Sequence, residues 1–290
     1  MEFATGDGDD TINGFMSKDI ISLSGSNYYT KETTNSSVKI SLVSGSGSMT
    51  LLDASDKTIN VEGSTLLNVV INRINSKKIT AGNAKDSITN HGNKVTIIGA
   101  SDMDSICNYS ANVSINGGSD NDYIRNFGTD STLTGGAGND SIGNYAKGYM
   151  NGKLVTENGG KNVKIFGGAG ADSIENSGAN VTINGGAGND EIINSGVNVS
   201  INGGDGKDTF IYKPGEGTDK IFDFQNNDLL TIINKDGTEG GSFKSPKFSG
   251  GDLTLTIKGG DKVIFDGASN VDKFNINGTS YKISGSKLVK

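Results

Sequence analysis

The sequence lacks the residues from which most enzymes and most broad globular cores are built. Its 290 residues include no tryptophan, one histidine (His91), one cysteine (Cys107) and two prolines, and aromatic residues make up 7%. A single cysteine excludes an intramolecular disulfide framework. Zinc sites of the usual His and Cys type have no set of ligands here. With 33% apolar residues, a thin repetitive core is expected rather than a wide one.

Long apolar runs are absent too, so no membrane span is expected, because a spanning helix needs roughly 18 to 20 apolar residues. The first residues, Met1 to Gly6, contain neither the basic nor the apolar region of a cleavable signal. Export therefore uses another route, or the chain is a piece of a longer one. The net charge is −7 and the basic residues are scattered, which disfavours a nucleic-acid partner and favours cations.

Glycine is abundant, at 44 residues, and it recurs within a repeat of 18 residues. The segment 181–192 aligns with 199–210, and the same register reaches back to 95–106. A flexible linker is the alternative for such a polar, Gly-rich chain, but a linker has no need of aliphatic residues at fixed spacing. Two aliphatic columns predict two short strands per coil: Ile97, Ile115, Leu133, Ile165, Ile183 and Ile201; and Ile88, Ile106, Ile124, Ile142, Ile174, Ile192 and Phe210.

Two kinds of turn alternate between these strands. One reads Gly-Gly-x-Gly-x-Asp, at 135–140, 167–172, 185–190 and 203–208, with a variant at 117–122. The other reads Asn-x-Gly-x-Asn-Val, and its first asparagines form a column that can hydrogen-bond along the stack: Asn90, Asn108, Asn126, Asn144, Asn176 and Asn194. The register breaks once, and residues 146–161 are expected to form a surface loop outside the stack.

The aspartates that end the first kind of turn also form a column: Asp86, Asp104, Asp122, Asp140, Asp172, Asp190 and Asp208. Stacked coils place such residues about 4.8 Å apart. Two unit charges at that spacing repel by roughly 3.5 kcal/mol at an effective dielectric of about 20. Divalent cations between the loops would reverse this term. Carboxylates and turned-in backbone carbonyls are a hard oxygen set that suits Ca²⁺ better than Mg²⁺.

The turns Gly-Gly-Ala-Gly-Asn-Asp-Ser-Ile, Gly-Gly-Ala-Gly-Ala-Asp-Ser-Ile and Gly-Gly-Ala-Gly-Asn-Asp-Glu-Ile resemble the nonapeptide repeat of RTX, or haemolysin-type, calcium-binding proteins. The resemblance implies a parallel β-roll in which several Ca²⁺ ions lie between the loops of successive coils, held by Asp and by backbone carbonyls. It also implies secretion through a type I exporter. The residues expected at metal sites are Gly117, Gly118, Asp120, Asp122, Gly135, Gly136, Gly138, Asp140, Gly167, Gly168, Gly170, Asp172, Gly185, Gly186, Gly188, Asp190, Gly203, Gly204, Gly206 and Asp208.

Two further points depend on the same resemblance. The segment after Asp208 is similar to the one that closes many RTX rolls, which implies that Asp219 completes the last site. In the family both turns of a coil usually carry the calcium motif, whereas here the second turn carries asparagine. Metal is therefore expected along one edge. Whether Asp10, Asp86 and Asp104 bind metal is left open.

The expected fold is all-β, a right-handed parallel β-roll or β-solenoid of 18-residue coils with a C-terminal β-cap. Residues 1–80 are expected to form degenerate coils with an isolated calcium-type loop, residues 81–212 the roll, and residues 213–290 the cap with a secretion signal. The expected function is a calcium-binding module of a secreted bacterial protein that folds on binding calcium after export. We expect a monomer.

An extracellular adhesin that binds a cell-surface glycan is the alternative function. Catalysis is not expected, because nucleophilic chemistry would have to use His91 or Cys107. His91 stands at a turn position that later coils fill with Ser177 and Ser195, and Cys107 at a variable outward position. Both are interpreted as ordinary substitutions.

Overall fold

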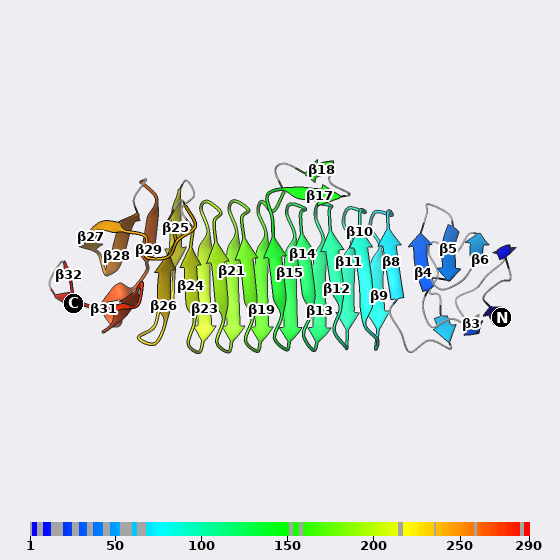
Figure 1. Cartoon of the computed structure of the whole chain (residues 1–290), viewed down its shortest axis with the longest axis horizontal. Helices are drawn as coiled ribbons and strands as arrows, with labels where there is room; N and C mark the ends of the chain where they lie inside the picture. The colour runs from blue at the N-terminus through cyan, green and yellow to red at the C-terminus, as the bar shows by residue number, and fades with distance from the viewer. Residues whose placement is uncertain are drawn as a thin grey trace.

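In the computed structural model, short strands lie side by side along one long axis (Figure 1). Backbone and side chains are described for residues 70–147, 159–213, 217–234, 236–257, 260–284 and 287–290, without the Ser245 side chain; elsewhere only the backbone of strands is described. Regular structure in these parts is strand, apart from one 3₁₀ turn, η1 (Ala268–Asn270). None of the helical structure in the described residues could cross a membrane.

Two sheets form opposite faces of the stack, and the coils contribute parallel strands to both. The first sheet takes from the coils β8 (Asn68–Asn72), β10 (Asp86–Asn90), β12 (Ser105–Asn108), β14 (Tyr123–Asn126), β16 (Ser141–Asn144), β20 (Ser173–Asn176), β22 (Glu191–Asn194) and β24 (Thr209–Tyr212). The second takes β9 (Lys78–Gly82), β11 (Thr96–Ala100), β13 (Ser114–Ser119), β15 (Thr132–Ala137), β19 (Lys164–Ala169), β21 (Thr182–Ala187) and β23 (Ser200–Asp205). The predicted parallel β-solenoid is confirmed.

The register of the stack is the one that the repeat predicts. Ile183 stands beside Ile201, and Ile174 beside Ile192, on neighbouring strands. Each strand alternates, so that β21 is exposed at Thr182 and buried at Ile183. Both predicted aliphatic columns are buried, and a third column, of valines, joins them: Val95, Val113, Val163, Val181 and Val199. Burying one such side chain stabilises the fold by about 1.5 to 3 kcal/mol. Since each coil packs only on its neighbours, these contributions add up from coil to coil.

The break in the repeat leaves the stack intact. β15 pairs with β19, and β16 with β20, across the extra residues. The insertion itself is more regular than the expected loop, because β17 (Gly148–Met150) and β18 (Lys153–Thr156) form an antiparallel hairpin (Figure 1). Between them the sequence reads Asn151-Gly152, the dipeptide typical of two-residue hairpin turns, and this signal could have identified the hairpin.

Parallel stacking continues beyond residue 212 into the C-terminal segment. β25 (Thr218–Ile221) and β29 (Lys262–Phe265) extend the second sheet, and β26 (Leu229–Ile232) and β30 (Phe274–Ile276) extend the first. Antiparallel strands complete the segment: β27 (Phe243–Ser249), β28 (Asp252–Ile257), β31 (Thr279–Ser284) and β32 (Lys287–Val289). Packed rings of Phe210, Phe224, Phe265 and Phe274, with centroids 4.9 to 5.7 Å apart, fill the end of the core.

The N-terminal segment mixes parallel and antiparallel pairs. β4 (Tyr29–Thr33) pairs with β8 in parallel and with β5 (Ser37–Leu42) in antiparallel fashion. β6 (Gly47–Leu52) follows, and it pairs in parallel with β2 (Gly8–Ile12). A small separate sheet contains β1 (Glu2–Ala4), β3 (Ile20–Ser24) and β7 (Asn60–Glu62). Asp10 lies in β2, and its side chain is outside the described residues.

Candidate metal edge

The aspartate column lies along one edge of the solenoid, where the chain passes from the second sheet to the first. We call this the aspartate edge, and its members are Asp86, Asp104, Asp122, Asp140, Asp172, Asp190 and Asp208, each at most 2% exposed. In the turn that ends at Asp190, Gly186 and Gly188 have φ angles of 117° and 137°. Residues that carry a side chain rarely adopt these backbone angles, so the bend needs glycine.

One oxygen of each carboxylate is used within the protein. The backbone N–H of every aspartate in the column donates a hydrogen bond to Oδ1 of the next one, as from Asp122 to Asp140 (2.7 Å) and from Asp172 to Asp190 (2.8 Å). Asp140 and Asp172 make the same bond (2.8 Å) across the hairpin insertion. The sequence predicted the column but gave no sign of these side-chain-to-backbone bonds.

The other oxygen, Oδ2, is buried and has no hydrogen-bond partner among the described residues in Asp104, Asp122, Asp140, Asp172, Asp190 and Asp208. It lies against the first glycine of its turn, which can be this close because glycine has no side chain. A Cβ placed on Gly185 would lie within 3.0 Å of Asp190 Oδ2 and of the Gly203 carbonyl oxygen from the next coil. The same holds at Gly117, Gly135 and Gly167. A carboxylate oxygen and a backbone carbonyl oxygen therefore converge at each step, which is a donor set suited to a hard cation.

The electrostatics of this edge point the same way. Burial raises the pKa of Asp104 and Asp172 to about 7, and that of Asp122 and Asp208 to about 6. The hydrogen bond from the preceding backbone N–H lowers each pKa in part, and the charges of neighbouring carboxylates raise it further, as Asp86 does at Asp104. Burial therefore disfavours the ionised form of these four carboxylates, and a positive charge beside them would stabilise it.

Backbone groups are essential to any ion at this edge. The described residues contain no group of three or more His, Cys, Asp or Glu side chains that could hold a metal. The expected glycines lie in the turns beside the Oδ2 atoms, with Gly118, Gly136, Gly168, Gly186 and Gly204 at positive φ. The carbonyls nearest the Oδ2 atoms belong to the first glycine of the following turn, such as Gly135 beside Asp122, and they are the remaining oxygen donors.

Two expected residues lie elsewhere. Asp120 is exposed at the tip of its turn, with φ 75°, where its Oδ2 accepts a hydrogen bond from the backbone N–H of Asp102 (3.2 Å). Asp219 lies in β25 on the opposite edge, next to Asn194 and Val199, and the structure does not bring it together with Asp208.

The residues that end the aspartate edge, Asp223 and Asp228, were not expected from the repeat. The backbone N–H of Asp208 donates to Oδ1 of Asp228 (2.9 Å), whose Oδ2 accepts from Gln225 N–H (2.7 Å). Asp223 accepts hydrogen bonds from the backbone N–H groups of Gly203 (2.9 Å) and Gly204 (2.7 Å). Asp228 follows Asp208 by 20 residues rather than 18, so a search at the repeat spacing does not find it.

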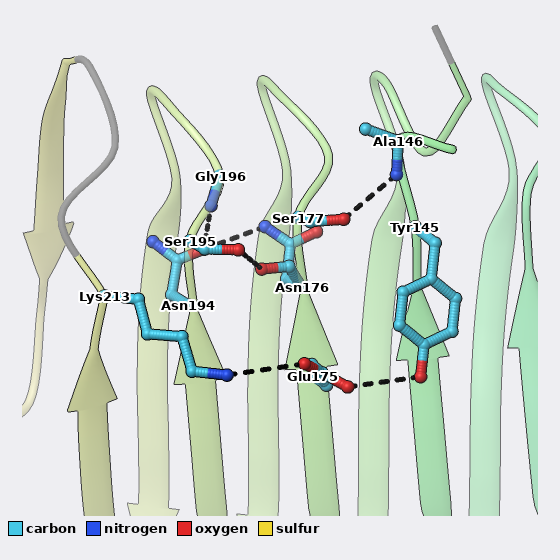
Figure 2. A network of polar contacts seen from close by, with 9 residues as sticks. All are labelled: Tyr145, Ala146, Glu175, Asn176, Ser177, Asn194, Ser195, Gly196 and Lys213. Atoms are coloured by element: carbon cyan, nitrogen blue, oxygen red, sulfur yellow. Dashed lines mark hydrogen bonds and ion pairs between the residues drawn. The ribbon is translucent and has the colours of Figure 1, made fainter. Parts of the chain in front are cut away.

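The opposite edge is closed by amides. We call it the asparagine edge: Asn72, Asn90, Asn108, Asn126, Asn144, Asn176 and Asn194, each at most 2% exposed. From Asn72 to Asn176, each Nδ2 donates to Oδ1 of the next asparagine at 2.7 to 2.9 Å, which confirms the predicted column. Figure 2 shows Asn176 and Asn194, where Asn194 Oδ1 also accepts from Gly196 N–H (3.1 Å).

Aromatic rings stack beside the asparagine edge, directly after four of its members. His91, Tyr109, Phe127 and Tyr145 lie face to face with centroids 5.0, 5.1 and 5.4 Å apart. His91 therefore has a packing role that its interpretation as an ordinary turn substitution did not include. The occurrence of four aromatic residues at the same repeat position could have indicated this role. Beyond Tyr145 the column changes to serine, and the Tyr145 hydroxyl donates to Glu175 (3.2 Å), as Figure 2 shows.

Comparison with known proteins agrees with this geometry. Four stretches match the family described as RTX calcium-binding nonapeptide repeat: residues 3–28, 128–142, 159–178 and 166–196. They include the turns that end at Asp140, Asp172 and Asp190, and the segment 5–12. The chain therefore carries RTX calcium-binding repeats, as the resemblance predicted. No curated protein matches the chain.

Proposed function

We propose that this chain is a calcium-binding module whose ions lie between successive turns along the aspartate edge. The observation that carries the proposal is the buried Oδ2 atom, which has no hydrogen-bond partner among the described residues in six successive turns and lies near a glycine carbonyl of the next coil in five of them, from Asp104 to Asp190. The residues that would hold the ions are the aspartates and turn glycines expected from the sequence, without Asp120 and Asp219. Bound Ca²⁺ would supply the positive charge that buried carboxylates need.

The protein's own part is to set the oxygen donors in place. The hydrogen bond to Oδ1 fixes the orientation of each carboxylate, so that Oδ2 lies against the first glycine of its turn, as at Asp190 and Gly185. Positive φ angles at Gly186 and Gly188 shape the turn that presents the carbonyls. Stacking of the inward isoleucines holds successive turns together. Each site therefore requires two folded coils, which links calcium binding to folding.

We infer that the module folds on calcium binding after export. RTX repeats are typical of secreted proteins. At low calcium, the uncompensated carboxylates oppose stacking, and the chain can pass an exporter unfolded; at extracellular calcium, binding free energy becomes folding free energy. A type I secretion apparatus is the proposed partner for export.

Circular dichroism and calorimetric titration test this function. The chain in chelator is expected to show little β signal, and added calcium should raise it. Asp208→Asn should weaken calcium binding, whereas Asp205→Asn should not, because Asp205 carries the same charge in the same turn but is exposed. Identical spectra with and without calcium would reject folding on binding, and equal titrations of both variants and wild type would reject the site.

The sites should differ in strength along the edge. Ala100 pairs with Gly82 on one side and with Gly118 on the other. Ala81 is therefore equivalent to Gly99 and Gly117, the first glycines of the following turns. A Cβ on the equivalent Gly99 would come within 3.0 Å of Asp104 Oδ2, so the Ala81 methyl group is expected to move the Asp86 carboxyl out of the position that the other aspartates take. Asp190→Asn is expected to lower calcium affinity about tenfold or more, and Asp86→Asn much less. Equal losses in calorimetric titration would contradict this ranking.

A second candidate function, binding of a cell-surface glycan, is favoured by one groove. It has a volume of about 760 Å³ and lies between the turn 222–227 and the turn 266–271. Phe222 is 44% exposed there, and Asp266 and Asn270 add a carboxylate and an amide, a combination that suits a sugar ring and its hydroxyls. Glycan-array binding that Phe222→Ala abolishes would support it; an array without hits would reject it.

We assign no catalytic role to the two residues considered for nucleophilic chemistry. His91 packs its ring on Tyr109, and burial lowers its pKa. Burial raises the pKa of the Cys107 thiol, which disfavours the reactive thiolate. Activity assays on the calcium-loaded chain against ester and peptide substrates would reveal any error in this assignment.

A further inference from the structure

Asp219 occupies a position that is apolar in most other coils. β25 pairs with β23 so that Ser200 stands beside Lys220 and Ile201 beside Ile221, which places Asp219 next to Val199. Val199 is the last of the buried valine column, and the Asp219 carboxyl that follows it is 1% exposed. A carboxylate in such a column is costly unless hydrogen-bond donors meet it.

Donors do meet the Asp219 carboxylate on both oxygens. Its Oδ1 accepts from the backbone N–H of Val199 (2.7 Å), and its Oδ2 accepts from Nδ2 of Asn194 (3.1 Å). The Tyr212 hydroxyl donates a further hydrogen bond to it. Asp219 therefore differs from the six members of the aspartate edge from Asp104 to Asp208, whose Oδ2 atoms have no such partner among the described residues.

The asparagine edge also has a direction. Every Nδ2 along it points to the Oδ1 of the following coil, so the last asparagine has an N–H group left over. On the next strand of the first sheet, Tyr212 stands beside Asn194 and provides no amide to continue the column. Asp219 supplies the missing acceptor from the second sheet.

We propose that Asp219 is the terminator of the asparagine edge and not a calcium ligand. The aligned amide dipoles put positive partial charge at this end of the column, which a carboxylate stabilises as it does at a helix N-terminus. Asp219 is thus a positioning residue, which acts on Asn194 and on the β23–β25 pairing. The contrast with a calcium ligand rests on the function proposed above.

Three variants test the proposal on the full chain. Asp219→Val introduces the valine that five other coils carry and removes both acceptors. Asp219→Asn removes the charge, and Asp208→Asn removes a proposed calcium ligand. Three quantities are measured: the number of calcium ions bound, the unfolding equilibrium in urea, and the side-chain amide resonances of Asn194 and Asn176.

Asp219→Val is expected to bind as many ions as wild type, while its unfolding equilibrium constant rises about ten- to a hundredfold, since a buried N–H without an acceptor costs about 1 to 3 kcal/mol. The Asn194 side-chain resonances should move most, and those of Asn176 less. The unfolding equilibrium constant of Asp219→Asn should lie between those of Asp219→Val and wild type. Asp208→Asn should lose calcium and leave the Asn194 resonances in place.

The proposal is overturned if Asp219→Val is as stable as wild type, or if it binds one ion fewer while the Asn194 resonances do not move. Failure of the calcium function is separate. A wild-type chain that folds but binds no calcium would reject that function, and the urea and resonance comparisons, made without calcium, would still judge Asp219.

Discussion

The two edges of the solenoid carry similar columns of side chains but close them differently. An amide both donates and accepts, so the asparagines satisfy one another from coil to coil, as Asn126 does with Asn108 and Asn144. A carboxylate only accepts. From Asp104 to Asp208 the aspartates therefore take a backbone donor on one oxygen, and the other has no hydrogen-bond partner among the described residues, as in Asp140. The asparagine edge therefore satisfies its own hydrogen-bonding groups, whereas the buried carboxylate oxygens of the aspartate edge would be stabilised by a cation.

Placing a carboxylate in the asparagine edge should have the largest effect. In Asn126→Asp the new oxygen would face two acceptors that Nδ2 now serves, Asn144 Oδ1 (2.8 Å) and the Gly128 carbonyl (3.0 Å). We expect a loss of about 3 kcal/mol or more in the free energy of unfolding, measured in urea at saturating calcium. Asn180→Asp is the control, because Asn180 is exposed at a column position where Asp130 occurs naturally. Equal effects at both positions would remove the contrast between the edges.

Filling the space beside one carboxylate should come next. The Cβ of Gly185→Ala would press on the Gly203 carbonyl and on Asp190 Oδ2, where we propose an ion. A loss of about 1 to 3 kcal/mol in stability is expected from the steric conflict, together with weaker calcium binding in calorimetric titration. Gly82→Ala is the matched control, since a Cβ there meets no atom within 4 Å. If Gly185→Ala binds calcium as tightly as Gly82→Ala does, the cation site is not at this position.

Acid should partly replace calcium on the aspartate edge. Burial raises the pKa of Asp104 and Asp172 to about 7, above the ordinary value of 3.8, so the folded state takes up protons before the unfolded state does. Stability without calcium should therefore rise as the pH falls from about 8 through 7 towards 4. Far-UV circular dichroism in chelator should show more β structure at about pH 6 than at pH 8. With calcium the trend should reverse, because protons compete for the same oxygens; a pH-independent signal would contradict this.

The sequence predicts the features of this structure that repeat at a fixed spacing, on both edges. The repeat spacing predicts the inward isoleucines, the asparagine edge and the aspartate edge, because stacking turns a sequence period into a column in space. The bonds to Oδ1 could not be predicted, since they depend on the orientation of a carboxylate relative to the neighbouring backbone. Asp228 escaped because its turn is two residues longer.

Asp219 illustrates a different limit. A resemblance to a family gives the order of residues along the chain, but not the edge on which a residue lies once two turns per coil differ. Only the pairing of Lys220 with Ser200 places Asp219 beside Asn194. The aromatic stack was missed for another reason: His91 and Phe127 share a position but not a residue type, and stacking depends on ring shape.

The smallest effect is expected outside both edges, where Glu175 accepts from the Tyr145 hydroxyl (3.2 Å) and pairs with Lys213 (3.6 Å), as Figure 2 shows. The Glu175 and Lys213 side chains are both 44% exposed, so water screens the pair. Glu175→Gln should change the free energy of unfolding by less than about 1 kcal/mol and leave calcium binding as it is. Burial and then the Glu175 charge raise the pKa of Tyr145 to about 12, and the variant should lower it in ultraviolet titration. A loss as large as that of Asn126→Asp would mean that this surface network, and not the asparagine edge, holds the coils together.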